Sequence, residues 1–190
     1  ILGVLQAYMG QSTGVDISDS MLDVAKAKYG NVNFLNCDLT KTSIFDEKSF
    51  DVITAFRFFL NAQQDLRDEA FLAIRKIIKE DGVFIFNIHM NEGCILNRIT
   101  KLYQWIKQID DPEYHAVNHK EVQAWAQKSG FEIVQTYHFG VLPIYEQRFH
   151  GMLKQIYQVE RRLSAFKIFL PISRYTIYIC RTQTNLQSPI

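Results

Sequence analysis

Two hydrophobic periods alternate along the first 90 residues of the chain. Short runs of apolar and β-branched residues predict β-strands at 12–17, 32–38, 50–56 and 83–88. Between them, apolar residues recur at three- and four-residue spacing, which predicts helices over 18–30 and 66–78. Ser18 can cap the first helix and Gly30 can end it, whereas Asp81 and Gly82 close the second. Strands that alternate with helices in this way predict an α/β fold with right-handed crossovers.

The pattern changes after residue 90. Helical spacing recurs at 93–109 and 119–129, a strand pattern at 132–139 and 174–181, and a long amphipathic pattern at 148–170. We expect 93–109 and 148–170 to be helices packed on the sheet. The strand at 83–88 is apolar nearly throughout, which is typical of a parallel strand buried on both faces. The predicted organisation is one domain over 1–182, with inserted segments at about 91–118 and 148–170 and a tail at 183–190.

Composition narrows the class of protein without naming its function. The 190 residues are 47% hydrophobic and 22% charged, and the formal net charge is +1, which excludes a disordered tail or a fibrous repeat. The three cysteines are scattered and the five histidines show no ligand spacing, so no disulfide framework and no metal site are predicted. No apolar run approaches the roughly 20 residues that span a bilayer. We therefore expect a cytoplasmic protein, and the near-zero charge does not favour nucleic-acid binding.

Two acidic residues end successive predicted strands. Asp16 closes the strand at 12–17 and Asp38 closes the strand at 32–38. In a doubly wound sheet, ligands bind outside the carboxyl ends of the strands, where a carboxylate can accept hydrogen bonds from ribose hydroxyls or an exocyclic amine. Each acid alone has an ordinary explanation as a turn or capping residue. Together, at matching positions, they favour a nucleoside site.

Four segments of the chain resemble the class I S-adenosylmethionine-dependent methyltransferases. They are Gly14-Val15-Asp16-Ile17-Ser18 with Met21-Leu22, then Asn36-Cys37-Asp38-Leu39, then Phe50-Asp51-Val52-Ile53-Thr54-Ala55, and finally the run from Ile74 to Val83. The resemblance implies a doubly wound three-layer α/β sandwich, Rossmann-like, whose mostly parallel sheet has an antiparallel last strand. That last strand, at 174–181, would lie between the strands at 83–88 and 132–139.

The resemblance also implies a cofactor, S-adenosylmethionine, and residues that would bind it. Asp16 would bind the ribose, and Ile17 and Met21 would pack on the adenine. Asp38 would accept from the adenine amino group, with Leu39 beside it. Ala55 and Phe56 would line the methionine portion. Methyl transfer in the family is a direct displacement in which alignment of the nucleophile matters most, so a dedicated base is optional.

One departure from the family pattern concerns its first strand and glycine-rich loop, which would precede Ile1. We expect this chain to be an N-terminally truncated form. Six strands should then form, with the pair at 12–17 and 32–38 either separated from or directly contacting the strand at 50–56. The isolated chain should be unstable and should have little cofactor affinity, because inner strand edges stay unpaired.

Two other functions remain open from the residues. A non-catalytic Rossmann-like binding domain would follow if the glycine-rich loop is genuinely absent. Tyr103 and Lys107 have the Tyr-x-x-x-Lys spacing of the nicotinamide-dependent short-chain dehydrogenases, although no Asn-x-Ala-Gly follows the strand at 50–56.

Further candidate residues lie in the second half of the chain. His89 directly follows a predicted strand and titrates near neutrality, so it is the candidate general base, with Asn91 and Glu92 as weaker candidates. Between 148 and 181, seven basic residues accompany a single acid, Glu160, and share the amphipathic stretch with apolar residues. This pattern suggests a small or lipid-like acceptor and peripheral membrane contact through 148–170, or simply a solvated basic face.

Overall fold

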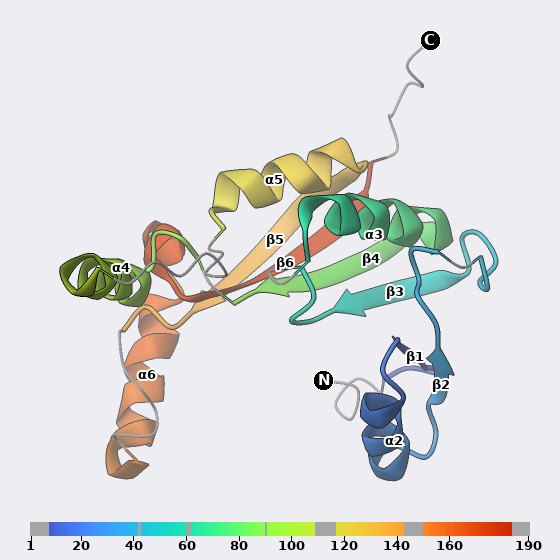
Figure 1. Ribbon diagram of the computed structural model, residues 1–190, viewed down its shortest axis with the longest axis horizontal. Helices are drawn as coiled ribbons and strands as arrows, with labels where there is room; N and C mark the ends of the chain where they lie inside the picture. Colours follow the sequence, from blue (N-terminus) through green and yellow to red (C-terminus); the bar gives the residue numbers. More distant parts are fainter. Residues whose placement is uncertain are drawn as a thin grey trace. The chain divides into compact units, whose positions relative to one another are not determined.

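The computed structural model describes residues 8–41, 43–59, 62–89, 91–108, 117–142 and 150–183. They fall into two compact units, Ile1–Asp46 and Glu47–Ile190, shown in Figure 1. The strands form two sheets, one in each unit, and the two units are described separately below.

The first unit is a β-α-β element. Strand β1 (Thr13–Asp16) is followed by helix α2 (Asp19–Lys28) and strand β2 (Asn33–Asn36), which pairs with β1 in parallel. Ser18 caps α2 as predicted, because its Oγ accepts a hydrogen bond from the Met21 backbone N–H. Both strands are shorter than the sequence patterns suggested. Asp16 is still the last residue of β1, whereas Asp38 lies two residues beyond the end of β2.

The second unit contains a four-stranded sheet with the order β3-β4-β6-β5. Its strands are β3 (Phe50–Ala55), β4 (Ile78–Ile88), β5 (Phe131–Phe139) and β6 (Tyr175–Thr182). Strand β3 pairs with β4 in parallel, and β6 pairs antiparallel with both β4 and β5. The predicted insertion of the last strand between its two neighbours is therefore confirmed. The carboxyl ends of β3, β4 and β5 all lie at one end of this sheet.

Helices α3 (Gln64–Ile77) and α5 (His119–Lys128) lie on the same side of the four-stranded sheet (Figure 1). Beneath them is an aromatic core centred on Phe59, which is fully buried and contacts Phe71 and Phe86 at ring-centroid distances of 4.7 and 5.2 Å. Residues of β4 on this face are buried, whereas Val83 and Ile85 on the opposite face are only half-buried. The expectation that this strand is buried on both faces is therefore not met within the second unit.

The connection from α3 to β4 differs from the prediction. Asp81 and Gly82 do not end the helix, because α3 ends at Ile77 and Ile78 already pairs with Phe50 of β3. The register then shifts, and Val52 pairs with Val83. A Cβ atom on Gly82 would lie 2.6 Å from the Ile78 side chain and 2.9 Å from the Lys79 carbonyl oxygen. Gly82 is therefore needed because of an irregularity within β4. The sequence pattern had suggested that it ends a helix.

The two segments predicted to be packed helices have few buried residues. Helix α4 (Ile95–Lys107) buries only Asn97, and helix α6 (Leu153–Leu163) buries no residue. The amphipathic stretch is also broken into shorter pieces: η2 (His150–Met152), α6, and the 3-10 segment η3 (Lys167–Ile172), which contains Pro171. Figure 1 shows α4 and α6 at the end of the sheet where β3, β4 and β5 terminate, rather than on its faces.

Candidate functional site

Asp16 is an exposed carboxylate at the carboxyl end of β1. Its Oδ1 accepts a hydrogen bond of 2.9 Å from the backbone N–H of Ser18, which fixes the turn into α2. Because β1 and β2 are parallel and Asp16 pairs with Asn36, the ends of both strands lie at the same edge of the sheet. Asp16 and Asp38 therefore belong to one edge, as the sequence predicted. The remaining acceptor positions of the Asp16 carboxylate suit a pair of ribose hydroxyls.

Two large apolar side chains next to Asp16 are exposed. Ile17 is 71% exposed and Met21 is 60% exposed, although both belong to the turn and first helical turns that follow β1. Exposed apolar side chains of this size beside a carboxylate form a surface with an apolar part and a hydrogen-bond acceptor. That is the combination required by a nucleoside, whose base is flat and apolar on its faces and whose ribose donates hydrogen bonds.

Asp38 is held by the residues that follow it. Its Oδ1 accepts from the Thr40 backbone N–H at 3.0 Å and from the Thr40 hydroxyl at 2.6 Å, and Lys41 Nζ lies 3.4 Å from Oδ2. The hydrogen bond from the Thr40 hydroxyl, with help from its backbone N–H and Lys41, lowers the pKa of Asp38. The carboxylate is therefore an ionised acceptor with a fixed orientation. Leu39, beside it, is half-buried.

In the second unit, β3 ends at the two residues predicted to line a cofactor. Ala55 and Phe56 are half-buried, and Arg57 follows with a left-handed backbone (φ 61°). The Arg57 N–H donates to Asn87 Oδ1 of the neighbouring strand at 2.7 Å, and Phe59 then anchors the loop in the core. The loop after β3 is thus fixed by the hydrogen bond to Asn87 and by the burial of Phe59. The sequence analysis did not identify Asn87.

His89 follows the last residue of β4, at the same end of the sheet. Its Nδ1 is buried and has no hydrogen-bond partner among the described residues. Burial lowers the pKa of His89, and the positive charges of Arg57 and Arg174 lower it further. The imidazole is therefore neutral near pH 7, which leaves it able to accept a proton. The two arginines nevertheless oppose the charged form.

Other sequence candidates have ordinary structural roles in this part of the chain. The Asn91 side chain donates to the Leu170 carbonyl at 3.0 Å and accepts from the Gly93 N–H, so it connects the end of β4 to η3. Glu92 forms an ion pair of 3.6 Å with Lys101. Tyr103 is exposed on α4. Across the described residues, no cluster of three His, Cys, Asp or Glu side chains is arranged to hold a metal ion.

Arg57 and Arg174, like Asn87, are site residues that the sequence analysis did not identify. The left-handed backbone of Arg57 leaves no recognisable pattern in the sequence around it. The approach of Arg174 to His89 leaves none either, because the two residues are far apart in the chain. The only available signal was position: Arg57 comes two residues after Ala55 and Arg174 directly before the last strand.

The four-stranded sheet with its antiparallel β6 and the parallel β1–β2 pair belong to an α/β fold of the Rossmann-like kind seen in S-adenosylmethionine-dependent methyltransferase structures. Residues 1–86 match the family model described as a methyltransferase domain. The predicted resemblance to methyltransferases is thereby confirmed over residues 1–86, and the α/β fold predicted from the sequence is confirmed as well.

Particular relatives agree with this class. A protein of Geobacillus sp. (strain WCH70) that is named as a methyltransferase is 34% identical over 84 residues, which cover 40% of this chain and 33% of that protein. The match thus spans about a third of that curated relative.

Solved structures extend the likeness to nearly the whole chain. The structure of a Haloferax volcanii methyltransferase in complex with the Trm112 activator has a TM-score of 0.65 at 17% identity and covers 98% of this chain and 78% of its own. A SAM-dependent methyltransferase from Archaeoglobus fulgidus has a TM-score of 0.62 at 15% identity and covers 95% and 80%. Phosphoethanolamine N-methyltransferase 2 of Haemonchus contortus, solved with S-adenosyl-L-methionine, has a TM-score of 0.61 at 20% identity and covers 95% and 45%. At these identities the likeness shows the fold.

Proposed function

We propose that this protein transfers a methyl group from S-adenosylmethionine to a small or amphiphilic acceptor. The observation that carries the proposal is the edge of the β1–β2 sheet, where Asp16 and Asp38 lie together and Ile17 and Met21 are exposed. The family match of residues 1–86, which includes all four side chains, supports the same cofactor.

These residues fit the cofactor by their own chemistry. The Asp16 carboxylate, which already accepts from the Ser18 N–H, would accept hydrogen bonds from the ribose hydroxyls, and Asp38, ionised and oriented by Thr40, would accept from the adenine amine. Ile17, Met21 and Leu39 supply apolar contacts to the base.

S-adenosylmethionine supplies an electrophilic methyl group on a sulfonium. When bound, it would give this methyl group to a nucleophile of the acceptor, with the carbon–sulfur bond breaking and S-adenosylhomocysteine released. The protein contributes alignment of the two reactants. His89 is the candidate to take the proton that a hydroxyl or amine acceptor loses, because its imidazole is neutral near pH 7.

The amphiphilic class of acceptor is supported by side chains at the end of the sheet. Trp105 of α4 is 77% exposed and Ile168 of η3 is 80% exposed, and Leu102, Ile106 and Phe166 are exposed as well. Basic residues accompany them: α4 carries Arg98, Lys101 and Lys107 and no acid. Exposed apolar residues mixed with cations favour an anionic, lipid-like surface, and we propose that α4 and residues 150–172 contact it peripherally. No helix among the described residues is long and apolar enough to cross a membrane.

The test is a calorimetric titration of S-adenosylhomocysteine into the protein at the length its gene encodes. The Asp16→Ala variant should lose roughly 1–3 kcal/mol of binding free energy, because a charged hydrogen-bond partner is removed. Asp23→Asn is the matched control, since Asp23 is an exposed acid of α2 that pairs only loosely with Lys26, at 3.8 Å. Unchanged affinity in Asp16→Ala would remove Asp16 from the site.

A non-catalytic binding domain is the second candidate. It would bind the nucleoside through the same edge without turnover. Release of S-adenosylhomocysteine during incubation with candidate acceptors distinguishes the two, because only the enzyme forms it.

A further inference from the structure

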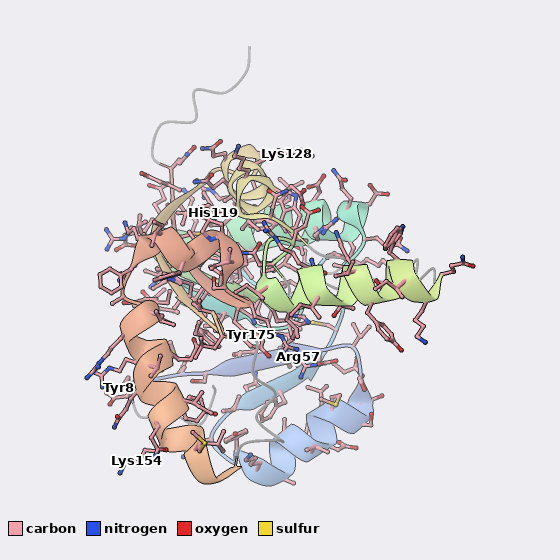
Figure 2. All side chains as sticks on the ribbon, turned by 90° about the vertical axis from the view of Figure 1, so that its left-hand side faces the viewer. Tyr8, Arg57, His119, Lys128, Lys154 and Tyr175 are labelled. Carbon is pink, nitrogen blue, oxygen red and sulfur yellow. The ribbon has the colours of Figure 1, made fainter. Side chains whose placement is uncertain are left out.

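Three basic side chains come together at one end of the four-stranded sheet. Arg57 follows β3, His89 follows β4, and Arg174 precedes β6. The backbone holds them there: the Arg57 N–H bonds to Asn87, Ile88 pairs with Thr176, and the Asn91 N–H donates to the Arg174 carbonyl at 3.4 Å. Figure 2 looks onto this end of the unit and labels Arg57 and Tyr175, the residue after Arg174.

Neither arginine is neutralised by a described carboxylate. The ion pairs among the described residues all use lysines, and the Arg174 guanidinium lies instead over the Tyr175 ring, 5.0 Å from its centroid. The Glu160 carboxylate is directed to the segment after β5, whose Gly140 carbonyl accepts the Arg174 N–H at 3.0 Å. It accepts three backbone N–H groups, from Gly140, Val141 and Leu142.

This positive charge is concentrated around a histidine whose buried Nδ1 has no partner in the described structure. Two guanidinium groups and an imidazole offer charged and neutral N–H donors, which together match an oxyanion. An anion bound there would also offset the repulsion that the arginines exert on protonated His89.

We propose that Arg57, His89 and Arg174 bind an oxyanion, a phosphate or a carboxylate, that belongs to the methyl acceptor. The assignment to the acceptor rests on the proposed methyltransferase function, whereas the anion site itself does not. The same chemistry would also suit the carboxylate of the cofactor's methionine portion, so the experiment separates these two sources.

The first part of the experiment uses inorganic phosphate as the probe. The imidazole resonances of His89 are followed by NMR during the titration. We expect them to shift with a dissociation constant in the millimolar range, and we expect Arg57→Gln and Arg174→Gln each to weaken binding about tenfold, because each removes one charged donor. Arg181→Gln is the matched control, since Arg181 is an exposed arginine at the opposite end of the same strand, β6. Unmoved His89 resonances, or equal weakening by Arg181→Gln, would overturn the site.

The second part identifies which molecule carries the anion. S-adenosylhomocysteine and 5′-methylthioadenosine, which lacks the amino-acid carboxylate, are titrated into the same variants. If the arginines hold the acceptor, both ligands should bind Arg57→Gln as they bind the unsubstituted protein. A loss for S-adenosylhomocysteine alone would assign the anion to the cofactor and overturn the acceptor assignment. Failure of both adenosyl ligands to bind, with phosphate still bound, would contradict the proposed function and leave the anion site standing.

Discussion

Glu160 attaches helix α6 to the rest of the second unit, and removal of its carboxylate should loosen that helix. Its carboxylate accepts backbone N–H groups of Gly140 at 3.0 Å, Val141 at 3.1 Å and Leu142 at 2.6 Å. Helix α6 buries none of its residues, and these three bonds join it to the segment that follows β5. The perturbation is Glu160→Ala.

The magnitude follows from the number and exposure of the bonds. A hydrogen bond to a charged group contributes about 1.5–3 kcal/mol when buried. Glu160 is half-buried, so we take about half of the lower values for each bond, which gives about 2–3 kcal/mol for the set. At 1.4 kcal/mol for each factor of ten, exchange of the three amide protons should accelerate roughly 30- to 150-fold.

Hydrogen exchange measured by NMR reads these donors directly. Protection at residues 140–142 and along α6 should fall, whereas protection at the core positions Phe84 and Phe86 should stay, because α6 lies outside the core. Glu69→Gln, at an exposed acid of α3, is the control. Unchanged protection of the three amides in Glu160→Ala would show that Glu160 does not attach α6 to the segment after β5. A uniform loss that includes the core would show that α6 is part of the folding unit.

Three further predictions test the pH response, the sheet and the exposed surface. Burial lowers the pKa of His89, His119 and His138 below 6.5, so the unfolded chain binds more protons than the folded chain as the pH falls below that value. The free energy of unfolding, measured by urea denaturation, should therefore be retained above pH 6.5 and decline as the pH falls through the folded pKa values. A flat profile from pH 7 to 5 would contradict this. Gly82→Ala should lower the melting temperature by several degrees, because overpacking costs about 1–3 kcal/mol, whereas Gly151→Ala, which meets no atom within 4 Å, should not. Trp105→Ala should weaken co-sedimentation with phosphatidylglycerol vesicles several-fold, with Leu72→Ala, an exposed leucine of α3, as control; equal loss in both would argue against membrane contact by α4.

Much of the fold follows from hydrophobic period and capping signals. The sequence places the six strands found among the described residues, the cap at Ser18 and the antiparallel return of the last strand, because strand and helix periods are local properties. It misplaces the end of α3, because Asp81 and Gly82 are as typical of a strand irregularity as of a helix end. Only the pairing of Ile78 with Phe50, which is a long-range contact, decides between the two.

Sequence pattern predicts the candidate site less completely. Asp16 and Asp38 could be found because each acid follows a recognisable strand. Arg174 could not, because its approach to His89 depends on antiparallel pairing between strands about 90 residues apart in the chain. The burial of α4 and α6 was overestimated for a related reason. An amphipathic pattern shows that a helix has an apolar face, and it does not show what covers that face.

The most direct test of the central claim is to map S-adenosylhomocysteine binding residue by residue, from amide chemical shifts in the protein at the length its gene encodes. We predict that the amides of Asp16, Ile17, Met21, Asp38 and Leu39 move together with one dissociation constant, and that those of the amino edge, such as Thr13 and Asn33, move little. Saturable binding whose shifts leave the carboxyl edge of β1 and β2 unmoved would contradict the account.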